Sequence, residues 1–185
     1  LVKRTGFGSL VQQKPLALAA HPLRIEAPIP GRALVGIEIP NRSIALVGLR
    51  SLIASDEFQK SAKSLLLSLG RDVSGNPVYA DLARMPHLLI AGATGTGKSV
   101  AIHSILTSLL YRNPPELLRF IIIDPKRVEL SSYSQIPHLL TPVITDAKKT
   151  ILALKWAGKE MDRRYEVLAK NHARDISSYS GEEEL

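Results

Sequence analysis

The chain has 185 residues, 45% of them hydrophobic and 22% charged, and it contains no cysteine. This balance is typical of a folded globular protein and excludes a wholly disordered chain. The absence of cysteine excludes disulfides, thiolate catalysis and cysteine-ligated metal centres. No apolar run reaches the roughly 18 residues that would span a membrane, and the five histidines do not recur at the spacing of a metal-binding helix.

The net charge of +7 is distributed unevenly along the chain. Residues 1–85 carry eleven basic and six acidic side chains, whereas residues 86–185 carry thirteen and eleven. A basic excess favours a polyanionic partner such as nucleic acid, but an ordinary solvated surface accounts for the same numbers. Charge alone leaves both interpretations open.

The first quarter of the chain predicts a strand, a turn and a second strand. Residues 1–15 show no periodicity and are expected to be a lead-in, and a helix end is expected at 16–20. Apolar and polar residues alternate over 23–27 and 33–39, on either side of a break at 28–31. This alternation predicts two half-buried strands.

The next segments predict a helix and a hairpin. Residues 44–53 are interpreted as a short strand that runs into a helix, and 56–63 as a charged connector. Residues 65–71 and 77–81 flank a turn whose glycine and asparagine tolerate left-handed backbone conformations. A β-hairpin is therefore expected here.

A strand–helix–strand unit is predicted after Pro86. Residues 87–91 and 118–123 are continuously apolar, as in parallel strands buried on both faces, and a right-handed crossover should join them. The helix between them should end at 113–115, where two prolines follow an asparagine. Its apolar residues recur at steps of three and four: Ile102, Ile105, Leu106, Leu109 and Leu110.

The last elements predicted are a third strand at 142–145 and a long amphipathic helix. Thr145 or Asp146 is the expected N-cap of this helix. An apolar stripe follows at steps of three and four: Ile151, Leu154, Gly158, Met161, Tyr165 and Leu168. The stripe is interpreted as covering the protein's own sheet, with a partner-binding surface as the alternative.

One motif carries chemistry. The turn after the first apolar strand matches G-x-x-x-x-G-K-[ST] between a strand and a helix, the setting of a phosphate-binding loop. Its backbone N–H groups should surround phosphate oxygens, Lys98 should reach the β- and γ-phosphates, and the Ser99 hydroxyl should bind Mg²⁺. A glycine-rich turn that merely connects strand to helix is the alternative. The candidate nucleotide-binding residues are Gly92, Ala93, Thr94, Gly95, Thr96, Gly97, Lys98 and Ser99, with Lys98 as the catalytic candidate.

Asp124 is a second candidate because it follows four apolar residues, the form of a Walker B strand. It could complete the Mg²⁺ shell. Many parallel strands also end in aspartate without any metal role, and the next strand in sequence need not be the next in space. Both interpretations stay open.

Longer segments around these motifs resemble the motor domain of the FtsK/SpoIIIE family of DNA translocases. The resemblance covers residues 16–179, and four separate segments carry it: 85–100, 123–130, 136–146 and 160–165. Upstream, residues 25–31 and 35–41 resemble the small α/β subdomain that precedes the RecA-like core in that family.

The resemblance implies an α/β fold with three parts: a lead-in at 1–15, a small α/β subdomain at 16–63 and the N-terminal part of a RecA-like P-loop ATPase core at 64–185. The sheet of this core should be incomplete and mostly parallel. The implied function is ATP- and Mg²⁺-dependent movement along double-stranded DNA by a hexameric ring, serving chromosome segregation at cell division or sporulation. A cytoplasmic location is expected, with membrane tethering only through regions absent from this chain.

The sequence departs from the family pattern at the catalytic carboxylates. In the family these follow a later apolar strand ending in Asp-Glu, beyond the segment that corresponds to Tyr179, and this chain ends at Leu185. The resemblance therefore places Asp124 in an Asp-Pro-Lys motif of unassigned role rather than in Walker B. In a ring, an arginine of one subunit can contact the nucleotide bound to its neighbour. The sequence does not indicate which arginine of this chain would have that role.

Three functions are compatible with these observations. The first is part of an ATP-dependent DNA translocase, and the second is a nucleotide-binding module that assembles or binds DNA without hydrolysing ATP. The third, an unrelated P-loop kinase or GTPase, predicts an acceptor site or an Asn-Lys-x-Asp motif, and the sequence shows neither.

Overall fold

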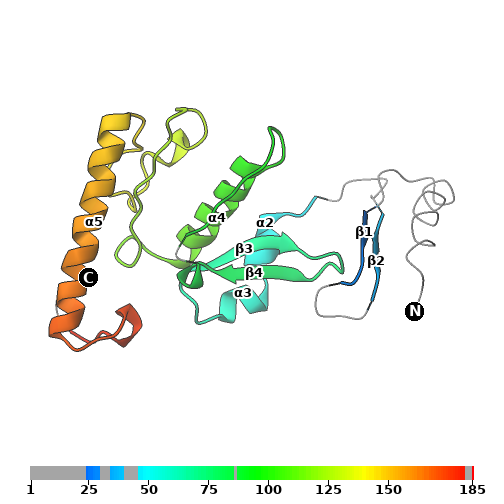
Figure 1. Cartoon of the computed structure of the whole chain (residues 1–185), viewed down its shortest axis with the longest axis horizontal. Coiled ribbons are helices and arrows are strands. Elements are labelled where there is room, and N and C mark those ends of the chain that lie inside the picture. Colours follow the sequence, from blue (N-terminus) through cyan, green and yellow to red (C-terminus); the bar gives the residue numbers. More distant parts are fainter. Residues whose placement is uncertain (1–23, 30–33, 40–45, 86, 182–184) are drawn as a thin grey trace. The chain divides into compact units, whose positions relative to one another are not determined.

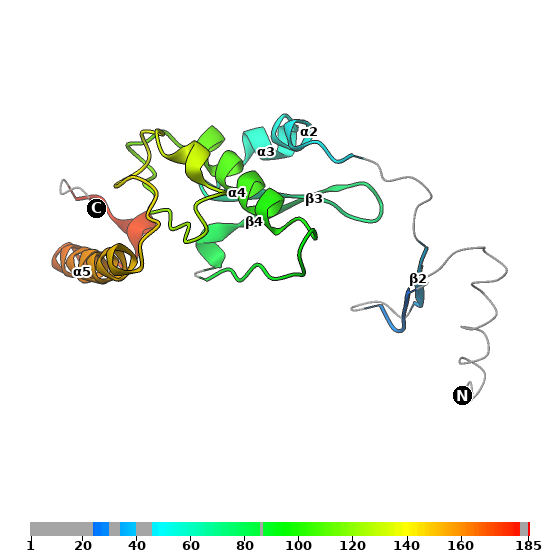
Figure 2. The same cartoon turned by 90° about the horizontal axis from the view of Figure 1, so that it is seen from above.

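The computed structural model describes residues 24–29, 34–39, 46–85, 87–181 and 185 (Figures 1 and 2). It divides by packing into two compact units, residues 1–47 and 48–185. The lead-in at 1–15 and the helix end predicted at 16–20 lie outside the described residues.

The first unit contains a two-stranded antiparallel sheet. Strand β1 (Arg24–Glu26) pairs with β2 (Gly36–Glu38), and Ile25 lies opposite Ile37. The two predicted strands are thus confirmed, and the break predicted between them at 28–31 lies partly outside the described residues. Ile37 keeps 39% of its surface exposed, so no described part of this unit covers the apolar side chain fully.

The second unit begins with two short helices, α2 (Leu49–Ile53) and α3 (Asp56–Lys60). The prediction of a charged connector from residue 56 is wrong, because Ser55 caps α3 by accepting a hydrogen bond from the Phe58 N–H at 3.2 Å. Two acidic residues in the first turn favour the same helix end. The strand predicted before α2 is absent from residues 46–48.

The hairpin is present as predicted. Strand β3 (Leu66–Arg71) pairs antiparallel with β4 (Pro77–Asp81), which leads into the 3₁₀ helix η1 (Leu82–Arg84). In the turn, the Asp72 carboxylate accepts hydrogen bonds from the backbone N–H groups of Ser74 and Asn76 at 2.9 and 2.8 Å.

The core of the second unit forms where the short helices meet this hairpin. Ile53, Phe58 and Leu66 are its buried cluster, and Tyr79 packs against them with its ring 5.7 Å from that of Phe58. Because α2 and α3 contribute to this core, the division by packing falls at 47/48, earlier in the chain than the predicted boundary at 63/64.

Helix α4 (Lys98–Arg112) packs against β3, as Figures 1 and 2 show. The Ser108 hydroxyl accepts a hydrogen bond from the Ser68 N–H at 3.3 Å, and Leu106 and Leu109 are buried. The helix ends at its C-cap Asn113, before the two prolines, so the predicted helix and its end are confirmed.

The parallel sheet is only partly formed. Phe120 pairs with Leu139 and Ile123 with Ile144 in parallel bridges, so the second and third predicted strands are neighbours. Residues 87–91 are not a strand, and Leu89 is 89% exposed. The strand predicted at 87–91, and with it the strand–helix–strand crossover to 118–123, is therefore wrong for the described residues. A strand forms only where a neighbouring strand accepts and donates its backbone hydrogen bonds. Residues 87–91 have no such neighbour in the described part of the chain.

Helix α5 (Ala147–Lys170) is the longest helix described, and Asp146 is its N-cap, accepting a hydrogen bond from the Lys149 N–H at 3.0 Å. Its apolar stripe does not cover a sheet, which corrects the preferred interpretation. Leu168 is 8% exposed, but Leu154 is 62% and Tyr165 60% exposed. Within the described residues, no helix combines the length and apolar character needed to cross a membrane.

Candidate nucleotide-binding site

The candidate loop lies directly before helix α4. Gly97 is the N-cap of α4 with φ at 92°, and Gly95 has φ at 81°. Both values fall in the left-handed region, which side chains other than hydrogen make unfavourable. The motif's glycines thus allow the chain to turn sharply from residue 92 into the helix.

A threonine closes the inside of this turn. The Thr96 hydroxyl donates to the Ala93 carbonyl at 2.7 Å. A Cβ atom on Gly92 would lie 2.5 Å from the same hydroxyl, closer than real Cβ contacts come. Gly92 is therefore required by close packing rather than by its own backbone angles.

Lys98 folds back over the loop. Its ammonium group donates to the carbonyl oxygens of Gly92 and Ala93 at 2.7 and 2.8 Å, and it has no carboxylate partner in the described part of the chain. The charge is therefore held at the loop by two neutral acceptors. An anionic phosphate would be a stronger acceptor for this ammonium than a carbonyl is.

The loop also offers backbone donors. The N–H groups of Gly97, Lys98 and Ser99 donate to no acceptor among the described residues. They lie at the N-terminal end of a fifteen-residue helix, where unpaired N–H groups and the helix dipole favour an anion. Left-handed glycines, free donors and a lysine without a carboxylate partner fit a bound phosphate chain.

Asp124 is placed differently. The residue is 5% exposed, and its carboxylate accepts hydrogen bonds from the backbone N–H groups of Lys126 at 3.1 Å, Glu129 at 3.1 Å and Leu130 at 3.0 Å. These bonds, led by that from Leu130, lower the pKa of Asp124 and keep it ionised. Its contacts organise a loop and include neither Lys98 nor Ser99. No cluster of three or more potential metal ligands exists among the residues described.

Sequence reasoning missed a link between the two motifs. His103 of α4 contacts Tyr133 of the 3₁₀ helix η2 (Ser131–Tyr133), with Nδ1 and the hydroxyl oxygen 2.9 Å apart and the rings stacked at 5.6 Å. The helix that follows the phosphate-binding motif is thereby joined to the loop after Asp124. No sequence signal indicates this pair, because thirty residues separate its members.

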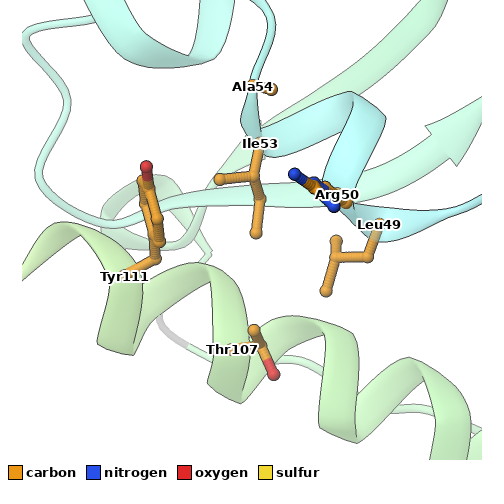
Figure 3. A pocket seen from close by; sticks show the side chains of 6 residues that line it. All are labelled: Leu49, Arg50, Ile53, Ala54, Thr107 and Tyr111. Carbon is orange, nitrogen blue, oxygen red and sulfur yellow. The ribbon is translucent and has the colours of Figure 1, made fainter.

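A separate pocket lies between α2 and α4 (Figure 3). It has a volume of about 370 Å³ and a mostly apolar lining. None of the candidate nucleotide-binding residues lines it, so it is distinct from the loop. Its lining residues are Leu49, Arg50, Ile53, Ala54, Thr107 and Tyr111.

Two family models match the chain. The FtsK/SpoIIIE family matches residues 48–184, and the FtsK alpha domain matches residues 2–41. The two matches meet near the packing division at 47/48.

Curated relatives match along almost the whole chain. DNA translocase FtsK of Caldanaerobacter subterraneus subsp. tengcongensis is 54% identical over 97% of this chain and 25% of its own length. DNA translocase SftA of Bacillus subtilis is 52% identical over 97% and 19%, and DNA translocase FtsK of Helicobacter pylori strain J99 is 50% identical over 97% and 21%. The chain thus spans a quarter or less of the length of these relatives.

A solved structure is similar in fold. The pCW3 conjugation coupling protein TcpA, in its monomer form with ATPγS, superposes with a TM-score of 0.61 over 100% of this chain and 50% of its own, at 23% sequence identity. At that identity the likeness is one of fold. Together with the parallel bridges it confirms the α/β class predicted for a partial RecA-like core.

Proposed function

The chain belongs to the FtsK/SpoIIIE family, and from this premise we propose that it is the nucleotide-binding part of an ATP-driven translocase of double-stranded DNA. Because the chain spans a quarter or less of its named relatives, the activity proposed is that of the complete protein. The proposal includes a role in chromosome segregation at cell division or sporulation and a cytoplasmic location. The observation that carries it is the loop before α4, with free donors and a lysine held only by carbonyls.

ATP would be held by the loop of residues 92–99. Lys98 would exchange its two carbonyl acceptors for β- and γ-phosphate oxygens, and the N–H groups of Gly97, Lys98 and Ser99 would donate to the phosphates. The Ser99 hydroxyl is the proposed Mg²⁺ ligand, and the metal would neutralise charge on the phosphates. A metal-binding role for Asp124 stays a prediction without support from its contacts, which are all with backbone N–H groups.

The proposed partners are double-stranded DNA and further copies of the same protein in a hexameric ring. The names of the close relatives and the basic excess of residues 1–85 support a DNA partner. Membrane attachment would come only through regions outside this chain.

Replacing Lys98 tests the proposal. In a full-length protein that carries this sequence, Lys98→Ala is expected to abolish DNA-stimulated ATP hydrolysis and to leave the fold intact, because Lys98 makes only two exposed hydrogen bonds. Lys63→Ala removes one exposed lysine far from the loop in sequence and is the matched control. Unchanged hydrolysis in Lys98→Ala would refute the assignment.

A second candidate is a module that binds nucleotide without hydrolysing it. The contacts of Asp124 favour it for this chain, since the carboxylate serves a loop instead of the Ser99 region. ATP binding without turnover by the 185-residue chain supports this candidate for the chain alone. DNA-stimulated hydrolysis by the same chain would exclude it.

A further inference from the structure

The loop of residues 124–130 is organised by hydrogen bonds to Asp124. The buried Asp124 carboxylate holds it from inside through three backbone N–H groups, and the Asp124 carbonyl accepts a further hydrogen bond from the Arg127 N–H at 3.1 Å. Within this turn Arg127 has φ at 59°. A non-glycine residue is unfavourable in that region because its Cβ comes close to the following carbonyl oxygen, so the turn maintains a strained residue at position 127.

This strained turn presents two adjacent cations to solvent. Lys126 and Arg127 are exposed, and neither makes an ion pair among the described residues. The Val128 N–H beside them also lacks an acceptor there. Two positive side chains and a free N–H thus follow one another in the chain, and each is a donor that an oxyanion accepts.

The loop is connected to the proposed nucleotide site through Tyr133. Its hydroxyl and ring contact His103 of α4, the helix that begins at Lys98. A displacement of α4 would therefore reach the segment that follows residues 124–130 through direct contact.

We propose that residues 124–130 form a second phosphate-contacting site, in which Lys126, Arg127 and the Val128 N–H bind a phosphate oxyanion and Asp124 is the positioning residue. The oxyanion comes either from a DNA backbone or from a nucleoside triphosphate. This inference rests on the proposed function and adds to it a ligand chemistry and a set of residues. It also replaces the metal-ligand role for Asp124 with a structural one.

The experiment uses the 185-residue chain and two probes, a labelled double-stranded oligonucleotide and a fluorescent ATP analogue. The variant Lys126→Ala/Arg127→Gly removes both charges, and glycine accepts the left-handed backbone of position 127, so the loop can keep its shape. Lys148→Ala/Lys149→Ala removes the same charge from the exposed start of α5 and is the matched control. Affinity for one probe should fall about tenfold or more in the loop variant relative to this control, as expected for lost phosphate contacts.

The probe that loses affinity identifies the source of the phosphate. Loss of DNA binding assigns the loop to the DNA backbone, and loss of analogue binding assigns it to the nucleotide; either result supports the site. Equal affinities of the loop variant and the control for both probes would overturn it. If Lys98→Ala still abolishes analogue binding in that case, the proposed function stands and only this inference fails.

Asp124→Asn tests the positioning role by the sign of its effect. The substitution makes the protein more positive, so general electrostatics predicts tighter phosphate binding, whereas loss of the loop's anchor predicts weaker binding. Weaker binding is expected, and combining Asp124→Asn with the loop variant should cause no further loss. Tighter binding, or an additive loss in the combined variant, would contradict the role. Helical circular dichroism separates these effects from unfolding.

Discussion

Gly97 and Arg127 both have left-handed backbones, but for different reasons. Gly97 is the N-cap of α4 with φ at 92°, which costs glycine nothing because it has no Cβ atom. Arg127 has φ at 59°, where its Cβ atom comes unfavourably close to the following carbonyl oxygen. Glycine at position 97 is explained by the turn that it makes. Arginine at position 127 has no such local explanation, and this is one reason why we include its guanidinium in the proposed oxyanion site.

Glu160 gives a residue-scale prediction on pH. Hydrogen bonds from Arg163 and Arg164, each at 2.8 Å, lower its pKa from 4.5 to about 2. A carboxylate with a lowered folded-state pKa stabilises the fold above its unfolded pKa, and this stabilisation is lost as the pH falls through the folded value. The difference in thermal midpoint between the wild type and Glu160→Gln should therefore be full above about pH 4.5 and narrow toward pH 2.

The matched control for this prediction is Glu166→Gln. It removes one exposed carboxylate from the same helix without breaking any ion pair of the described residues. If the difference in thermal midpoint between the wild type and Glu160→Gln stayed constant from neutral pH to pH 2, the hydrogen bonds from the arginines would not be stabilising the ionised carboxylate.

In helix α5, the residues that start and extend the helix do not determine which surface its apolar face packs against. Its start follows from the Asp146 cap, and its length from residues with good helical propensity. Its exposed apolar stripe has no such local cause, because covering a stripe requires a second element with complementary shape. Periodicity therefore predicted the helix correctly and its partner incorrectly.

Gly158 gives a prediction for the same helix. It lies in the interior of α5, and a Cβ atom built on it meets nothing within 4 Å. Gly158→Ala should raise the free energy of unfolding by up to about 1 kcal/mol, because alanine loses less backbone entropy in a helix. Denaturant unfolding followed by circular dichroism measures the change.

Gly97→Ala is the comparison for Gly158→Ala. It places the same methyl group where φ is 92°, so it should destabilise. Stabilisation by both substitutions, or by neither, would contradict the roles given to these two glycines.

At the scale of the whole molecule, the net charge of +7 bears on DNA binding. Contacts with DNA phosphates release counterions, so the logarithm of the affinity should fall linearly with the logarithm of the salt concentration. We expect a steep fall for the assembled full-length protein, measured by fluorescence anisotropy over a salt series, and little dependence on DNA sequence. A flat response would argue against phosphate-dominated binding.

The turn and helix that carry the candidate site were more predictable than the sheet. Residues 92–99 form the predicted turn and lead into the predicted helix. Both could be predicted because the glycines and the start of the helix lie within a few residues of one another. Asp124 was identified as notable, yet the sequence alone could not distinguish a metal ligand from a loop anchor. A buried carboxylate after a strand suits both roles. The structure shows the three backbone N–H contacts of the anchoring role, which depend on how residues 126–130 fold around Asp124, and the metal role stays a prediction.

The amino-acid sequence by itself determined the hairpin turn at 72–76, the start of α5 and the glycine-rich turn, since each depends on hydrogen bonds and backbone preferences among near neighbours. The tertiary structure decided which apolar segments find partners. Phe120 and Ile123 pair with Leu139 and Ile144. Within the described residues, 87–91 joins no strand pair, and most of the stripe of α5 stays exposed. The apolar character of a segment predicts that its burial stabilises the fold. Which surface buries the segment depends on contacts with residues distant in the chain.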